Sequence, residues 1–421
     1  MTQRTRTAVV CSVADQAVAA LTNIAVLVVA ARLSSAADFA VFSIVYMVFT
    51  VLLGIETSYV GQALVLERDD PAGGRGVREA CRSAVAFTAL ASSAVGGAAA
   101  LVLAALSGEV AGGLLALGLV LPVVLVQDTV RYCFSTLRLP QYALASDALR
   151  CAVVVPALAV QPEGSSAARL VAVWGLTALP ALLLGLALLA PRVRGAVTDW
   201  RRYLRRGHLG RRFVVEFAVG NGSSQLAVVG LGLFASQLAV GALRGAVTLY
   251  GPMNVLYNSA TSFGPPLLNR VAGPRRKVRA TAALAALLSG TAAVWTTVLV
   301  LLPERAGREI LGDTWSAASG LLPATGSQYA AIAAGTSALL TLRVLAPRAT
   351  LPIQVVFSLA SVGFLLCGYA VGGVLGAAWG LVVGSGLKAV ALWLRAGREA
   401  RGAEGGSGAV EAAGASGGRG V

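Results

Sequence analysis

The 421-residue sequence contains little charge: only 13% of its residues are Asp, Glu, Lys or Arg, about half the share of a soluble domain. Such a chain cannot cover a water-facing surface of its size. Hydrophobic residues make up 57% of the sequence, and the mean hydropathy is +0.76. Runs of about 20 mostly apolar residues recur along nearly the whole length, and each can cross a hydrocarbon core of about 30 Å. We therefore predict an all-α polytopic membrane protein.

Residues that commonly carry chemistry are also scarce. His208 is the single histidine and lies in a basic loop, so neither a metal site nor a Ser-His-Asp arrangement is expected. The cysteines are scattered without a CxxC pair and are expected to pack as small apolar residues: Cys11, Cys81, Cys133, Cys151 and Cys367. No GxxxxGK[ST] phosphate-binding motif is present. We predict neither an enzyme nor a cofactor-binding protein.

The apolar runs divide the chain into twelve expected spans and a tail. The first run, 8–31, is read as a membrane span because it is too long for a cleaved signal peptide. The tail, 397–421, is rich in Gly, Ala and Ser and is predicted to be disordered. The expected spans are 8–31, 39–66, 83–106, 110–136, 142–160, 167–190, 213–235, 240–268, 280–303, 317–342, 351–370 and 373–394.

The longest connection, 191–212, separates two sets of six spans. We predict an N-terminal lobe at 1–190, a basic cytoplasmic linker at 191–212 and a C-terminal lobe at 213–396. A weak similarity between the second and eighth spans supports two related lobes, which is how many transporters are built. The lobes are therefore expected to be pseudo-symmetric.

The formal net charge of +15 is best explained by membrane topology. With the N-terminus inside, most Lys and Arg residues fall on the inner side, as the positive-inside rule requires. Both termini are then cytoplasmic, and the inner loops can attract anionic bilayer lipids. The outer loops carry only Arg32, Arg169, Arg305 and Arg308. Nucleic acid is not expected as a partner.

Four charges stand at mirrored positions around the turn near residue 139. In an antiparallel hairpin of the fourth and fifth spans, Asp128 would face Arg150, and Arg131 would face Asp147. A lone charge at the bilayer centre costs roughly 2.5–3.5 kcal/mol, so pairing makes the burial tolerable. Two interpretations remain open. The charges form a static ladder, or they line a wet cavity where an arginine can exchange a carboxylate for a substrate phosphate.

Three segments carry a family resemblance. "DQAVAALTNIAVLVVAARLSSAADFAVF" (15–42), "QDTVRY…SDALR" (127–150) and "GALRGAVTLYGPMNVLYNS" (241–259) are similar to segments of polysaccharide-biosynthesis flippases. These O-antigen-type proteins form a branch of the multidrug/oligosaccharidyl-lipid/polysaccharide exporter superfamily. "ILGDTW" (310–315) also resembles a segment of such proteins, and the likeness covers all spans.

The resemblance implies two six-helix lobes around a central cavity and about twelve transmembrane helices. It implies a secondary transporter that flips a polyprenyl-pyrophosphate-linked saccharide from the inner to the outer leaflet by alternating access. The expected location is the bacterial cytoplasmic membrane, with energy from H⁺, Na⁺ or the membrane potential. Polysaccharide polymerases and glycosyltransferases are possible partners.

The same resemblance suggests roles for the intramembrane polar residues. The expected substrate contacts, chiefly to pyrophosphate, are Arg131, Arg150, Arg244, Asn23 and Gln16. The expected ion-coupling groups or counter-charges are Asp15, Asp128, Asp147 and Glu216.

Two alternatives remain at this point. One is a cation-coupled drug or metabolite exporter of the same superfamily, which would favour an acidic, aromatic cavity. The other is a non-transporting membrane scaffold for envelope assembly, in which the buried charges are purely structural.

Overall fold

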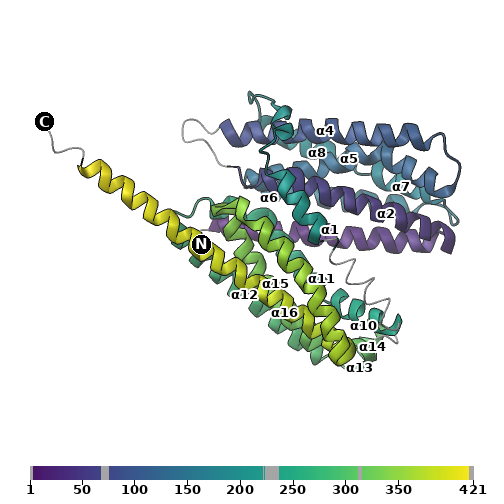
Figure 1. Cartoon of the computed structure of the whole chain (residues 1–421). Coiled ribbons are helices and arrows are strands. Elements are labelled where there is room, and N and C mark those ends of the chain that lie inside the picture. The colour runs from purple at the N-terminus through teal and green to yellow at the C-terminus, as the bar shows by residue number, and fades with distance from the viewer. Residues whose placement is uncertain (1–2, 68–74, 221, 223–236, 312–314, 417–421) are drawn as a thin grey trace. The chain divides into compact units, whose positions relative to one another are not determined.

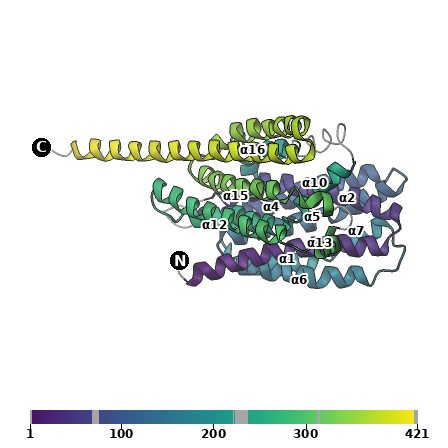
Figure 2. The same ribbon diagram turned by 90° about the horizontal axis from the view of Figure 1, so that it is seen from below.

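The computed structural model describes residues 3–67, 75–220, 222, 237–311 and 315–416. Every regular element in these ranges is helical, which confirms the all-α prediction (Figures 1 and 2). The chain divides into two compact units, Met1–Val214 and Val215–Val421. Each of the twelve predicted spans overlaps helix within the described residues. Eight of the described helical stretches are long and apolar enough to cross a membrane, and one of them, Pro347–Ala403, contains a reversal.

The outer faces of the helices are apolar. Leu21 is 63% exposed, Leu101 80% and Leu301 75%. Large aliphatic side chains in such numbers would promote aggregation of a soluble protein. In a bilayer they contact lipid tails, and the helices satisfy their own backbone hydrogen bonds. The chain is a multi-pass membrane protein.

Unit 1 is built around one central helix. Its helices are α1 (Gln3–Leu33), α2 (Ala36–Glu56), η1 (Thr57–Gly61), α3 (Gln62–Leu64), α4 (Arg75–Leu103), α5 (Glu109–Thr136), α6 (Pro140–Ala159), α7 (Ala167–Leu176) and α8 (Leu179–Leu189). Helix α5 packs against α2, α4, α6, α7 and α8, and α6 also packs along α1. Residues in the second half of α5 are therefore buried on most sides.

The segment 191–212 packs onto unit 1 as a folded element. It contains the end of η2 (Ala190–Arg192) and η3 (Trp200–Leu204). Tyr203 is 2% exposed and stacks on Phe87 with ring centroids 4.8 Å apart. The Tyr59 hydroxyl donates to the Tyr203 carbonyl at 2.6 Å. The predicted linker is thus attached to the N-terminal unit by packing and hydrogen bonds.

Unit 2 has a corresponding central helix. After helical residues 210–220, its elements are α10 (Gln237–Thr248), α11 (Gly251–Leu268), α12 (Pro274–Val300), α13 (Glu304–Leu311), α14 (Trp315–Ser319), α15 (Leu322–Leu345), η5 (Pro347–Ala349) and α16 (Thr350–Ser416). Helix α15 packs against α10, α11, α12 and α16. Both α5 and α15 carry the fourth predicted span of their six-span set, as expected for related lobes.

Helix α16 reverses direction at two glycines. Gly372 (φ −137°) and Gly373 (φ 58°) are non-helical, and the reversal lies at the boundary of the predicted spans 351–370 and 373–394. Beyond the reversal the two halves pack closely, since a Cβ on Gly380 would lie 2.1 Å from the carbonyl oxygen of Phe364. Only glycine fits there. Helix α16 then continues to Ser416 through the segment predicted to be disordered, where alanine, a strong helix former, is frequent.

Candidate functional site

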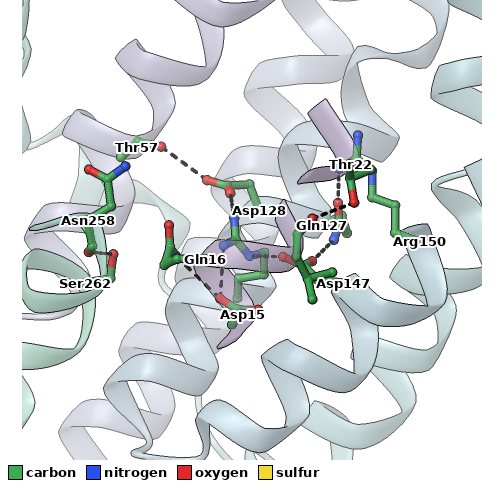
Figure 3. Close-up of polar contacts among 12 residues, drawn as sticks. Asp15, Gln16, Thr22, Thr57, Gln127, Asp128, Asp147, Arg150, Asn258 and Ser262 are labelled. Atoms are coloured by element: carbon green, nitrogen blue, oxygen red, sulfur yellow. Dashed lines mark hydrogen bonds and ion pairs between the residues drawn. The ribbon is translucent and has the colours of Figure 1, made fainter. Parts of the chain in front are cut away.

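Arg131 is the centre of a buried ion cluster in unit 1. It lies on α5 and contacts Asp15 on α1 at 3.1 Å, Asp128 on α5 at 2.7 Å and Asp147 on α6 at 2.8 Å. Figure 3 labels these three aspartates. The arginine side chain is 16% exposed, and the three carboxylate side chains are 5–10% exposed. Three helices are thus joined by one guanidinium group.

The predicted ladder is correct for one of its two pairs. Arg131 contacts Asp147 as the hairpin geometry predicted. The pairing of Asp128 with Arg150 is wrong, because Asp128 contacts Arg131, its i+3 neighbour on the same helix. The cause is Asp15: α6 packs along α1 as well as α5, so a third helix adds an acid to the centre of the hairpin.

Arg150 is held by neutral and aromatic groups. Its Nη1 donates to Gln127 Oε1, and its guanidinium carbon lies 5.7 Å from the centre of the Trp174 ring. Gln127 Nε2 donates to Asp147 Oδ1 at 2.7 Å, so an amide connects Arg150 to the cluster. Among the described residues, no carboxylate forms an ion pair with Arg150. Its positive charge is therefore less compensated than that of Arg131.

A fourth buried acid lies beside the cluster. Glu56, at the end of α2, is 7% exposed, and its Oε1 accepts from Thr129 Oγ1 at 2.6 Å. The next residue, Thr57, donates to Asp128 Oδ2 at 3.2 Å. The π-helical turn η1 begins at Thr57, and such turns are often found at functional sites. Glu56 was not among the predicted site residues, although an acid within an apolar run is itself the signal.

The cluster contains more acids than bases. Among the described residues, the acids Asp15, Asp128, Asp147 and Glu56 are accompanied by two guanidinium groups, that of Arg131 and, through Gln127, that of Arg150. Fully ionised, the group would carry two uncompensated negative charges at low dielectric. Burial of this excess is costly unless protons or a cation neutralise part of it. Binding of a proton or a cation to one of these carboxylates would therefore stabilise the cluster.

The other predicted residues lie outside this cluster. Asn23 is exposed on α1, about 12 Å along the helix from Asp15. Gln16 Nε2 lies 3.5 Å from Asp15 Oδ2, a weak contact at the edge. Glu216 belongs to unit 2, where it accepts from Arg343 at 3.2 Å and from Thr350. Arg244 lies on α10, but its side chain is outside the described residues.

The fold matches solved membrane transporters. No protein-family model matches the sequence, and no curated protein sequence does. A MATE transporter solved in complex with MaD3S matches over 94% of this chain and 95% of its own, with a TM-score of 0.79 and 12% identity. The chain shares the fold of the MATE transporters.

Two further MATE structures agree. A mutant of the Vibrio cholerae MATE transporter VcmN covers 95% of this chain and 97% of its own, with a TM-score of 0.77 and 13% identity. An outward-facing multidrug resistance MATE transporter of the MOP superfamily covers 94% of both chains, with a TM-score of 0.71 and 14% identity. On the MATE fold, the Arg131 cluster lies on the first, fourth and fifth spans of the first unit.

Proposed function

We propose that the chain is a cation-coupled secondary transporter that flips a polyprenyl-pyrophosphate-linked saccharide from the inner to the outer leaflet by alternating access. The observation that carries the cation coupling is the excess of buried carboxylates around Arg131. The MATE fold supports transport, and the three segments similar to polysaccharide flippases support this substrate. Its place would be the bacterial cytoplasmic membrane with both termini inside, where glycosyltransferases supply the substrate and a polymerase consumes the product.

The cluster suggests how cations and substrate are coupled. A proton or Na⁺ on one carboxylate weakens its contact with Arg131 and releases donor groups of the guanidinium. A pyrophosphate oxygen can then accept from the released donors, because guanidinium groups bind phosphate through paired hydrogen bonds. Arg150 adds a second positive charge without a carboxylate partner among the described residues. The membrane potential contributes about 2.3 kcal/mol per charge per 100 mV.

A second candidate is a cation-coupled exporter of cationic drugs or metabolites. The net negative charge of the same cluster favours it, because four carboxylates would attract a cationic substrate. One of the similar structures is described as a multidrug resistance transporter. The two candidates require opposite charges on the substrate, so one assay can separate them.

The test uses purified full-length protein in liposomes. One arm measures flipping of a fluorescent polyprenyl-pyrophosphate saccharide, by its accessibility to a membrane-impermeant quencher. The other arm measures uptake of ethidium, a cationic dye. We expect flipping without dye transport, loss of flipping in Arg131→Gln, and normal flipping in Arg305→Gln, whose side chain is 94% exposed. Dye transport without flipping would establish the exporter instead.

A further inference from the structure

Unit 2 contains a cavity of about 700 Å³ lined by its own helices. Leu243 of α10, Thr336 of α15, and Ser358 and Lys388 of α16 contribute to its walls. The reversal of α16 at Gly372–Gly373 brings both halves of this helix to the same cavity. The volume lies within the range of roughly 300–1,000 Å³ that is usual for small-molecule sites.

The cavity has a single cationic group among the described residues that line it. Lys388 Nζ lies 3.3 Å from Ser358 Oγ, and none of the described lining side chains is acidic. Lys388 interacts electrostatically with Glu216 and Arg343. These two already pair with each other at 3.2 Å, so the negative charge of Glu216 is engaged. An ionisable side chain within a membrane span is by default a candidate for a functional site, and Lys388 forms no ion pair with a carboxylate among the described residues.

Neutral polar groups with free hydrogen-bonding capacity line the same cavity. Within the described part of the chain, the side chains of Gln328, Gln354 and Ser385 make no hydrogen bond, although all three line the walls. Amide N–H₂ and hydroxyl groups donate readily to oxyanions. Together with Lys388 they provide several donors of the kind that a phosphate group requires.

The remaining wall is aliphatic. Leu243, Ile332 and Leu381 are among the side chains that line it. Such a surface favours an alkyl chain, because apolar area is removed from water when the chain binds. The cavity therefore combines one positive charge, neutral donors and an aliphatic surface.

We propose that this cavity binds an anionic amphiphile, with its phosphate group on Lys388 and its alkyl chain against the aliphatic wall. Gln354 and Ser385 complete the contacts to the phosphate oxygens. The proposal deepens the proposed function, on which its role in transport rests, by adding to the Arg131 contact a second site, within unit 2, that the phosphate-bearing end of the substrate occupies at another step of transport. The site is separate from the ion cluster around Arg131, which lies in unit 1.

Isothermal titration calorimetry on the full-length protein in a neutral detergent tests this site. The probes are hexyl phosphate, inorganic phosphate and hexyltrimethylammonium. We expect hexyl phosphate to bind most tightly and hexyltrimethylammonium not to bind. Lys388→Gln should weaken hexyl phosphate binding at least about tenfold, because a charge-assisted contact is lost. Lys388→Arg should retain binding, as should Lys277→Gln, which changes the only other lysine of the sequence.

Two variants keep the test valid if Lys388→Gln fails to fold. Gln354→Ala and Ser385→Val should each weaken hexyl phosphate binding while preserving the thermal unfolding transition. Unchanged binding in every folded cavity variant would overturn the proposal. Equal affinity for inorganic phosphate and hexyl phosphate would show that the alkyl chain contributes nothing. The proposal of an amphiphile would then be wrong, and the ligand would be a soluble anion. A Lys388-dependent site in a protein that flips no saccharide would contradict the proposed function alone.

Discussion

Arg131 has three carboxylate neighbours, and each carboxylate has only one arginine neighbour at ion-pair distance among the described residues. This asymmetry determines what a substitution does. If one acid is neutralised, Arg131 keeps two partners and the excess negative charge falls. If Arg131 is neutralised, three buried acids lose their only ion-pair partner among the described residues. Breaking a buried ion pair from one side typically costs 3–5 kcal/mol.

We therefore predict that Arg131→Gln destabilises unit 1 far more than Asp128→Asn. The arginine variant should lose about 3–5 kcal/mol of stability, whereas the aspartate variant should stay close to wild type. Thermal unfolding of the purified variants in one detergent measures the difference. Equal losses in the two variants would show that the cluster behaves as isolated pairs, against the shared-arginine geometry.

The sequence allowed only part of this cluster to be predicted. The prediction that paired residues by their distance from the hairpin turn was correct for Arg131 and Asp147, because that contact depends on local chain geometry. It failed for Arg150, whose partner Gln127 is a neutral residue at nearly the same depth as Asp128. The contact with Asp15 joins residues 116 positions apart. Such a contact depends on how α1 packs, which no local pattern specifies.

At the scale of elements, the close packing of the two halves of α16 depends on glycine. We predict that Gly380→Ala destabilises unit 2 by at least about 1–3 kcal/mol, because the added Cβ would meet the backbone oxygen of Phe364 at 2.1 Å. Gly386→Ala is the matched control on the same helix, since a Cβ there meets nothing within 4 Å. The control should be neutral or slightly stabilising. Thermal unfolding compares the two, and equal melting would contradict the close packing.

The linker segment should respond to pH through His208. Burial, together with Arg202 and Arg211, lowers the pKa of His208 to about 4. His208 Nδ1 also accepts a hydrogen bond from the Gly210 amide at 3.1 Å, which requires the unprotonated ring. Between pH 6.5 and 4 the unfolded segment binds a proton that the folded segment excludes. The stability of the folded linker is therefore full above pH 6.5 and decreases as the pH falls toward 4.

Hydrogen exchange of residues 199–212 measures this effect. After correction for intrinsic rates, protection in the wild type should fall between pH 7 and pH 5. His208→Gln should show little of this dependence, because the amide does not titrate in that range. A pH dependence that persists unchanged in His208→Gln would assign the effect to another group.

At the scale of the whole molecule, the segment pattern was predictable. Each of the twelve expected spans overlaps helix among the described residues, although residues 221 and 223–235 of the seventh span lie outside them. Apolar runs locate spans in this way because a membrane helix needs a long apolar stretch. The central position of α5 and α15 was not predicted from hydropathy. The π-helical turn η1 and the packing of the 191–212 segment onto unit 1 were also missed. These features depend on neighbours distant in the sequence.

The central claim is that the acids around Arg131 couple a cation gradient to flipping of an anionic substrate. The most direct measurement is the flipping rate in liposomes under an imposed pH or Na⁺ gradient, at fixed membrane potential, for wild type and Asp128→Asn. We predict that a gradient changes the wild-type rate several-fold and that this response is reduced or lost in Asp128→Asn, which remains folded. An equal response to the gradient in both proteins, or no response in either, would contradict the account.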